Sequence, residues 1–167
     1  KQNLFSITHE SDEVFSSIQR IMDEYRKKLL KSVTPRYSKL CPVIKHAKQV
    51  AVEHWNQDKI FSVVVIISDG KMVDLEQAVE LISSIDNFPL CFLIVTVKTQ
   101  KNPLIKTFAH HHGRVTNSQN NTSRRKIVKV LYYSNSLLSQ LHSLHKARVK
   151  TENMIQDWFL TYVFRNK

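Results

Sequence analysis

The chain has 167 residues, of which 42% are hydrophobic and 9% aromatic, a composition that excludes global disorder and favours one domain over residues 1–167. No apolar run approaches the roughly 18 residues needed to cross a bilayer, and Cys41 and Cys91 lie in apolar surroundings without metal-ligand spacing. We therefore expect reduced packing cysteines in a cytoplasmic protein whose formal net charge is +11.

The amino-terminal third of the chain predicts a short strand and two helices. Leu4–Ile7 is the strand candidate, and apolar residues then recur every three or four positions from Ser11 or Asp12 to Lys31. This spacing is typical of one face of a helix. After a polar loop, Pro42 suits the first turn of a second helix.

The middle of the chain predicts a strand, a helix and a second strand. Phe61–Ile67 is an apolar run bounded by a turn signal, which is typical of a strand buried on both faces of a parallel sheet. Asp74 is a candidate N-cap with Gln77 three residues later, a capping-box pair that opens a helix through Ser84. Leu90–Val97 is the second strand. This order predicts an α/β fold with a mainly parallel sheet flanked by helices.

The last third of the chain predicts a third strand and a terminal helix. Pro103–His112 favours a short helix, and Arg114–Ser123 is an Asn/Ser/Thr-rich loop. Ile127–Tyr132 predicts the strand. Ser136–Val149 is ambiguous, with leucines at helical spacing in a basic, serine-rich segment, whereas Thr151–Phe164 predicts a helix.

The strand at Phe61–Ile67 ends abruptly in the polar sequence Ser68-Asp69-Gly70. Open α/β sheets place their ligand sites at the carboxyl ends of strands, so Asp69 is a candidate ligand for a hard cation. A second interpretation is equally open: Asp69 is a turn residue that accepts hydrogen bonds from nearby backbone N–H groups.

Several ordered segments together resemble the copine-type von Willebrand factor A (vWA) domain. The closer matches are an apolar strand with its Ser-Asp-Gly turn and Asp-initiated helix (Phe61–Gln77), a second strand (Phe88–Val97), a loop with a helix start (Tyr37–Ile44) and the helix before it (Glu13–Leu30). The looser matches are the last strand (Arg125–Val130) and the last helix (Met154–Tyr162). The resemblance spans nearly the whole chain and implies a doubly wound, vWA-like or Rossmann-like α/β fold.

The resemblance also implies a metal-ion-dependent adhesion site at the carboxyl edge of the sheet. In the family, this site combines Asp-x-Ser-x-Ser from the first strand, a Thr from a later loop, and the Asp of Thr-Asp-Gly. Asp69 occupies the last of these positions, and Ser38 stands where the Thr is expected. Ser donates the same kind of hydroxyl oxygen, which suits Mg²⁺.

The first element of that site, Asp-x-Ser-x-Ser, occurs nowhere in the 167 residues. The family's first strand, first helix and second strand correspond to sequence upstream of Leu4, so the chain is predicted to be a single partial or divergent vWA domain whose amino-terminal strands are missing or rearranged. We expect no metal cofactor in this chain, and Mg²⁺ binding only where an upstream Asp-x-Ser-x-Ser segment exists. Unpaired sheet edges also raise the alternatives of a partner strand or self-association.

The leading hypothesis for function is a non-catalytic protein-interaction module. In the family, vWA domains recruit target proteins, which places partner binding at the loops after the strands, around Ser38, Ser68, Asp69 and Lys71. Separate C2 domains supply the family's phospholipid binding, and no C2-like segment occurs here. We do not expect an enzyme, because no Gly-x-Ser-x-Gly elbow or comparable ordered signature is present.

The alternative hypothesis is an electrostatic binder of an anionic phospholipid surface or of nucleic acid, with membrane association of a cytoplasmic protein as one consequence. Lys98–Lys150 contains eleven Lys and Arg residues and no Asp or Glu. Arg124, Arg125 and Lys126 are the candidate anion contacts. The run at His110–His112 is interpreted as a solvent-exposed basic turn instead of a metal site, because consecutive imidazoles cannot all face one ion.

Overall fold

A computed structural model of the chain describes residues 17–31, 38–69, 72–96, 108, 114–132 and 137–163. The chain divides into two compact units, Lys1–Ser38 and Lys39–Lys167. The strand predicted at Leu4–Ile7 lies outside the described residues. So does the helix predicted at residues 103–112, apart from Phe108, which is buried.

The first unit contains the helix α1, Ile18–Lys31, whose end agrees with the prediction. The predicted start at Ser11 or Asp12 precedes the described residues. No residue of α1 is buried, and an exposed pair between Lys27 and Glu24 lies on its surface. Exposed pairs three residues apart stabilise a helix by only about 0.2–0.5 kcal/mol, so α1 gains little from its own surface charges.

The second unit is built on a three-stranded parallel sheet in the order β1-β2-β3. The strands are β1 (Ser62–Ser68), β2 (Leu90–Thr96) and β3 (Val128–Tyr132), and the helices α2 (Cys41–Asp58) and α3 (Leu75–Ser84) precede and follow β1. The predicted strand–helix–strand unit is therefore confirmed, with α3 connecting two parallel neighbours, and the fold is α/β.

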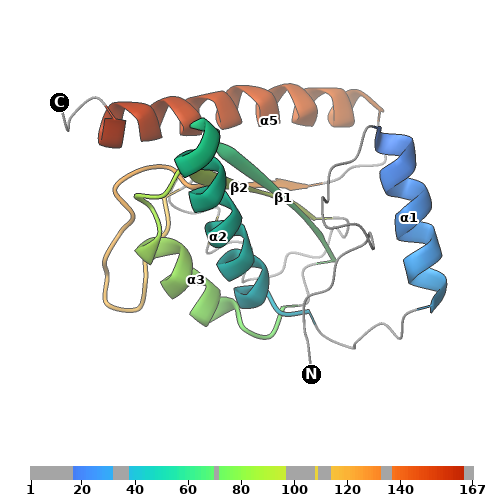
Figure 1. The fold of residues 1–167 in the computed structure, drawn as a ribbon, viewed down its shortest axis with the longest axis horizontal. Coiled ribbons are helices and arrows are strands. Elements are labelled where there is room, and N and C mark those ends of the chain that lie inside the picture. The colour runs from blue at the N-terminus through green and yellow to red at the C-terminus, as the bar shows by residue number, and fades with distance from the viewer. Residues whose placement is uncertain are drawn as a thin grey trace. The chain divides into compact units, whose positions relative to one another are not determined.

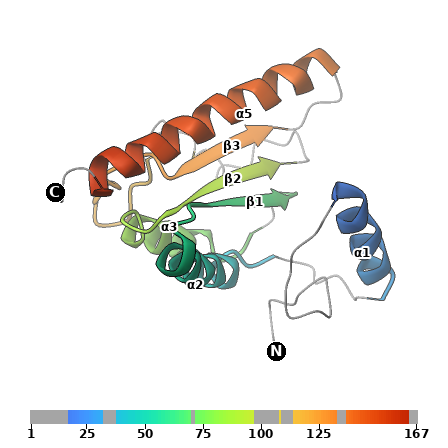
Figure 2. The same ribbon diagram turned by 45° about the horizontal axis from the view of Figure 1, so that its top comes forward.

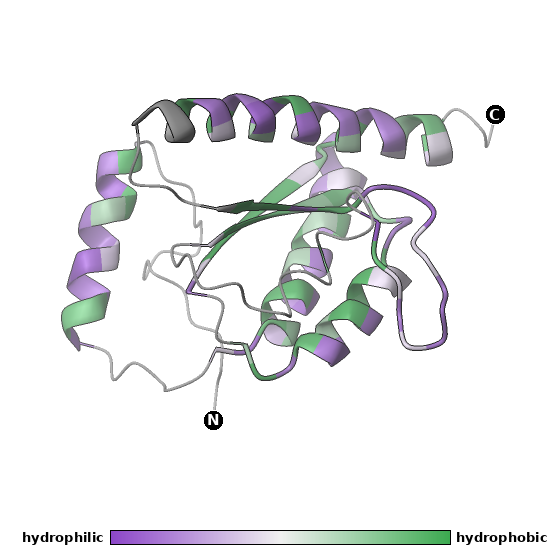
Figure 3. Ribbon diagram, turned by 180° about the vertical axis from the view of Figure 1, so that it is seen from behind, coloured by the Kyte–Doolittle hydropathy of each residue, from purple (hydrophilic) through white to green (hydrophobic). Residues whose placement is uncertain are grey.

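Helices cover both faces of the sheet (Figures 1 and 2). α2 and α3 lie on one face, and α5 (Leu137–Trp158) lies on the other, where it packs on β2 and β3. Side chains of β2 alternate between these faces: Leu90, Phe92 and Ile94 join the core cluster of α2 and α3, whereas buried Cys91 points to the opposite side. Figure 3 shows the apolar strands between the two helical layers.

From Leu137 onward, the ambiguous segment predicted at Ser136–Val149 and the predicted terminal helix form one continuous helix. α5 continues into a π-helical turn at Phe159–Val163. Its buried residues Ala147, Met154 and Trp158 recur at helical spacing, and the Trp158 ring packs edge-on against Trp55 with 4.7 Å between ring centroids.

The prediction that the strand after residue 60 is buried on both faces is wrong. Val64 and Ile66 pack against the core cluster beneath α2 and α3. Val63, Val65 and Ile67 are 41%, 55% and 71% exposed, because α5 packs mainly on β2 and β3 and leaves this side of β1 uncovered. An apolar run therefore predicts a strand, but whether each face of that strand is buried depends on where other elements pack.

Both cysteines have free thiols, as predicted. Burial raises the pKa of the Cys91 thiol to about 12, so this side chain stays protonated and serves as a small packing residue. Within the described ranges, no helix combines the length and hydropathy that crossing a membrane requires.

Candidate functional site

The carboxyl edge of the sheet brings the ends of the three strands into one row. Ser68 pairs with Thr96, and Thr96 pairs with Tyr132, so the strands end level with one another. Ser68 and Asp69 are half-buried at the end of β1, and both take part in interactions within the chain. Thr96 is 1% exposed, and its Oγ1 donates to the carbonyl oxygen of Leu131 at 3.4 Å. The sheet thus places the predicted Ser68–Asp69 pair at the edge where α/β folds bind ligands.

Asp74 lies at the predicted N-cap position of α3, but the predicted capping box is wrong. Its side chain makes no capping hydrogen bond to α3. The backbone N–H groups of Leu40 and Cys41 instead donate to its two carboxylate oxygens, at 2.7 and 2.9 Å. Leu40 is the N-cap residue of α2 and has no polar side chain, so a carboxylate from more than 30 residues away performs that role.

The environment of Asp74 favours its charged form. Burial opposes ionisation, but hydrogen bonds from the Leu40 and Cys41 backbone outweigh it, so the pKa of Asp74 lies below its ordinary value. Burial raises the pKa of Cys41, and Asp74 adds to that effect through a hydrogen bond and its negative charge. Asp74 therefore joins the starts of α2 and α3 as a structural anion.

Two predicted partner-binding residues, Ser38 and Lys71, have no described position relative to this edge. Ser38 is exposed and closes the first unit, whereas Asp69 belongs to the second, so the pairing of Ser38 with Asp69 spans the two units and stays a prediction. Lys71, like Gly70, lies outside the described residues. The described part of the edge therefore consists of Ser68, Asp69 and the strand ends beside them.

The donor chemistry at this edge does not form a metal site from the described residues alone. No three His, Cys, Asp or Glu side chains gather there or elsewhere in residues 17–31, 38–69, 72–96, 108, 114–132 and 137–163 in a group that could hold an ion. Asp74, the next carboxylate along the chain after Asp69, is held by two backbone amides. Mg²⁺ prefers several oxygen ligands in near-octahedral geometry, and Asp69 with Ser68 falls short of that set.

Arg125, one of the three predicted anion contacts, is fully buried at the amino end of the sheet. Its guanidinium donates to four backbone carbonyl oxygens, those of Asp86, Phe88, Leu90 and Lys126. Burial lowers the pKa of Arg125 to about 10, so it keeps its charge at neutral pH. Arg125 joins the connection between α3 and β2 to the start of β3, and its side chain is not available to a ligand from solution.

The residues on either side of Arg125 also use their backbone to hold this end of the sheet. The backbone N–H of Arg124 donates to Asp86 Oδ2 at 2.5 Å, and that of Lys126 donates to Asp157 Oδ2 at 3.3 Å. The Tyr162 hydroxyl donates to the second oxygen of Asp86 at 3.1 Å. The Arg124 side chain is exposed, and Lys126 is half-buried.

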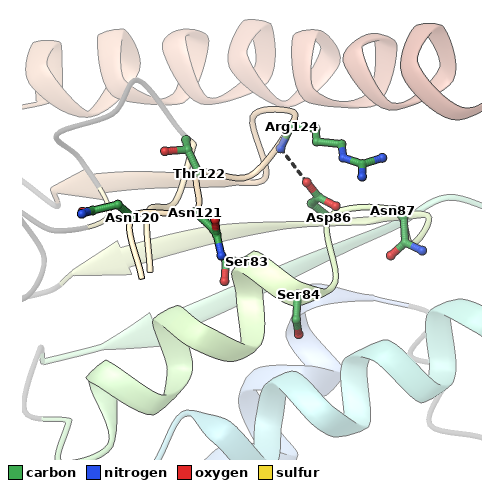
Figure 4. Close-up of a pocket in the computed structure, with 8 residues that line it drawn as sticks. All are labelled: Ser83, Ser84, Asp86, Asn87, Asn120, Asn121, Thr122 and Arg124. Carbon is green, nitrogen blue, oxygen red and sulfur yellow. Dashed lines mark hydrogen bonds between the residues drawn. The ribbon is translucent and has the colours of Figure 1, made fainter. Parts of the chain in front are cut away.

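A polar pocket of about 650 Å³ opens at the same amino end of the sheet (Figure 4). The predicted site at Ser68 and Asp69 lies at the opposite, carboxyl end of the strands. The end of α3 supplies Ser83 and Ser84, the loop before β3 supplies Asn120 to Thr122, and Asp86, Asn87 and Arg124 complete the lining. Both Asp86 oxygens already accept hydrogen bonds. The pocket is therefore lined mainly by neutral hydrogen-bonding groups beside one exposed arginine.

The fold and the edge together define a class of protein: an α/β domain of the vWA kind, with a parallel sheet, helices on both faces and a polar carboxyl edge. The family model described as Copine matches residues 1–159, so the chain belongs to the copine family. A comparison with curated proteins finds no match.

Proposed function

We propose that this chain is a non-catalytic protein-interaction module whose partner binds at the carboxyl edge of the sheet, beside Ser68 and Asp69. The observation that carries the proposal is the half-buried Ser68–Asp69 pair at the end of β1 in a copine-family domain. Hydroxyl and carboxylate oxygens at a strand end can hydrogen-bond a protein partner directly.

The perturbed side chains also support a binding role over catalysis. Shifted pKa values mark active sites when a cleft places an acid beside a base or nucleophile. Here the shift at Asp74 comes with backbone hydrogen bonds at a helix start, and those at Cys91 and Arg125 come with burial in the core. Each of these shifts has a structural cause.

Position-specific photo-crosslinking tests the location of partner binding. A benzophenone amino acid at Ile67, which is exposed beside the edge, should give a discrete adduct with a protein from a cell extract. The matched control carries the same group at exposed Ser84, at the amino end of the sheet. We expect the Ile67 adduct to disappear when Asp69→Ala is added. Equal adducts from both positions, or an adduct that ignores Asp69→Ala, would contradict the proposal.

We further propose that the adhesion site is incomplete in this chain. Titration with Mg²⁺ or Mn²⁺, followed by calorimetry, should show no saturable binding to the 167-residue protein. A longer chain with an upstream Asp-x-Ser-x-Ser segment should bind the ion, and Asp69→Ala should remove that binding. Tight binding to the 167-residue chain that Asp69→Ala abolishes would show that the site is complete.

A further inference from the structure

Three lysines lie on two elements that pack against each other, β3 and α5. Lys129 belongs to β3, where its neighbours Val128 and Val130 are buried in the core beneath α2 and α3. Side chains alternate along a strand, so Lys129 points to the other face, which α5 covers. Lys146 and Lys150 lie on α5, one helical turn apart, and both are exposed.

The three charges lie within electrostatic reach of one another. The pKa of Lys129 is lowered, first by burial and then by the positive charges of Lys150 and Lys146. Lys129 is half-buried, so its aliphatic stem is partly covered. The positive charge of its ammonium group is repelled by the charges of Lys146 and Lys150.

Across the described part of the chain, no carboxylate pairs with these lysines. The neighbours of Lys146 and Lys150 at three and four positions along α5 include no acidic residue. The helix carries Glu152 and Asp157, but Glu152 accepts a hydrogen bond from Arg148 at 2.9 Å and Asp157 accepts one from the Lys126 backbone. The ion pairs among the described residues involve none of the three lysines.

Like charges one turn apart weaken a helix, so three lysines without an acidic partner lower the stability of the ligand-free protein. Lysine ammonium groups bind phosphate oxygens as point charges, and such a ligand would convert this repulsion into attraction. We propose that Lys129, Lys146 and Lys150 form a binding site for a phosphate-dense anion, carried either on a lipid headgroup or on a free polyphosphate. This site is independent of the partner surface beside Ser68 and Asp69.

The test compares the 167-residue chain with the variant Lys146→Gln/Lys150→Gln, using inositol hexakisphosphate as the soluble probe. Calorimetry should give saturable binding to the parent chain and about a tenfold or greater loss of affinity in the variant. The matched control, Lys39→Gln/Lys45→Gln, removes the same net charge at exposed positions just before and within α2, which covers the opposite face of the sheet from α5. It should change the affinity by less than about twofold, because screening weakens distant charges.

Further arms identify the source of the phosphates. Phosphatidylcholine vesicles containing phosphatidylinositol 4,5-bisphosphate are compared with vesicles that carry the same charge as phosphatidylserine. Binding of the soluble probe, of the bisphosphate lipid or of both supports the site when it depends on Lys146 and Lys150. Asp69→Ala should leave this binding unchanged, which separates the site from the proposed partner surface.

Three results would overturn the proposal. The first is no binding to either phosphate probe. The second is an equal loss in the control and in Lys146→Gln/Lys150→Gln, which would indicate net charge alone. The third is tighter binding to duplex DNA than to either phosphate probe. Both substituted lysines are exposed, so circular dichroism spectra should match those of the parent chain.

Discussion

Two regions of one basic segment, residues 98–150, differ in what surrounds their positive charges. At the amino end of the sheet, buried Arg125 donates to four backbone carbonyl oxygens. Along α5, Lys146 and Lys150 lie near Lys129 and have no carboxylate partner among the described residues. The sign of the charge is the same, and the physical role follows from burial and partners.

The two side-chain types suit these two environments. A planar guanidinium presents five N–H groups in a fixed fork, so Arg125 can satisfy several carbonyl oxygens at a crowded chain connection. An ammonium on a flexible stem stays at the rim of the structure, where a ligand from solution can reach it. Arg125 therefore stabilises the fold, whereas the proposed role of the lysines is ligand binding.

Replacing Arg125 should have the largest effect on stability. Arg125→Met removes the donor to the carbonyl oxygens of Asp86, Phe88 and Leu90, and of these the Phe88 oxygen keeps the Leu90 N–H. We expect the free energy of unfolding to fall by roughly 3–5 kcal/mol, measured by urea denaturation followed by circular dichroism.

The neighbouring substitution Arg124→Met is the matched control for Arg125→Met. The Arg124 side chain is exposed, and only its backbone N–H bonds to Asp86, so the change should stay within about 0.5 kcal/mol. Equal losses for Arg124→Met and Arg125→Met would break the distinction between surface and structural charge in this segment.

Asp74 extends the comparison to a structural charge near the other end of the sheet. Asp74→Ala removes the acceptor for the Leu40 and Cys41 N–H groups at the start of α2, so stability should fall by about 1–2 kcal/mol in urea denaturation. Asp74→Asn retains one carbonyl acceptor and should lose less.

The contribution of Asp74 should depend on pH. Its folded-state pKa lies below the ordinary aspartate value of about 3.9, so the unfolded chain binds the proton more readily. The stability difference between the parent chain and Asp74→Ala is therefore fully present above about pH 4 and is lost as the pH falls through the folded-state pKa. A difference that stays constant down to pH values below that point would show that the carboxylate charge is not involved.

The elements with strong local patterns could be predicted from the sequence. The branched aliphatic run before Ser68 and the helical spacing from Leu75 to Ser84 predicted β1 and α3, and the order of elements predicted their parallel sheet. Because parallel strands end at one edge, the position of Ser68 and Asp69 also followed from the sequence.

Features that depend on distant residues could not be predicted in this way. The cap of α2 comes from Asp74, more than 30 residues downstream, although the apolar N-cap Leu40 signalled that an acceptor was needed. The exposed side of β1 depends on where α5 packs. Arg125 is buried while Arg124 beside it is exposed, a difference that the run Arg-Arg-Lys does not encode.

Removing the Tyr162 hydroxyl should have a smaller effect at the amino end of the sheet. Tyr162→Phe loses the hydrogen bond to Asp86 Oδ1, which should lower the free energy of unfolding by about 1 kcal/mol. Tyr25→Phe on exposed α1 is the control and should change stability by less than about 0.5 kcal/mol. If both variants unfold at the same urea concentration as the parent, Asp86 does not need this partner.

The smallest expected effect has the opposite sign. Lys150→Gln removes repulsion from Lys129 and Lys146, so the free protein should gain about 0.2–0.5 kcal/mol, or roughly 1 °C in its thermal midpoint. Arg148→Gln, two positions away, loses the pair with Glu152 and should be destabilised by a similar amount. With inositol hexakisphosphate present, the parent chain should become more stable than Lys150→Gln. The reason is that a ligand that binds the native state stabilises the chain that binds it more tightly. If Lys150→Gln destabilises the free protein as Arg148→Gln does, Lys150 has a structural partner and the contrast with Arg125 fails.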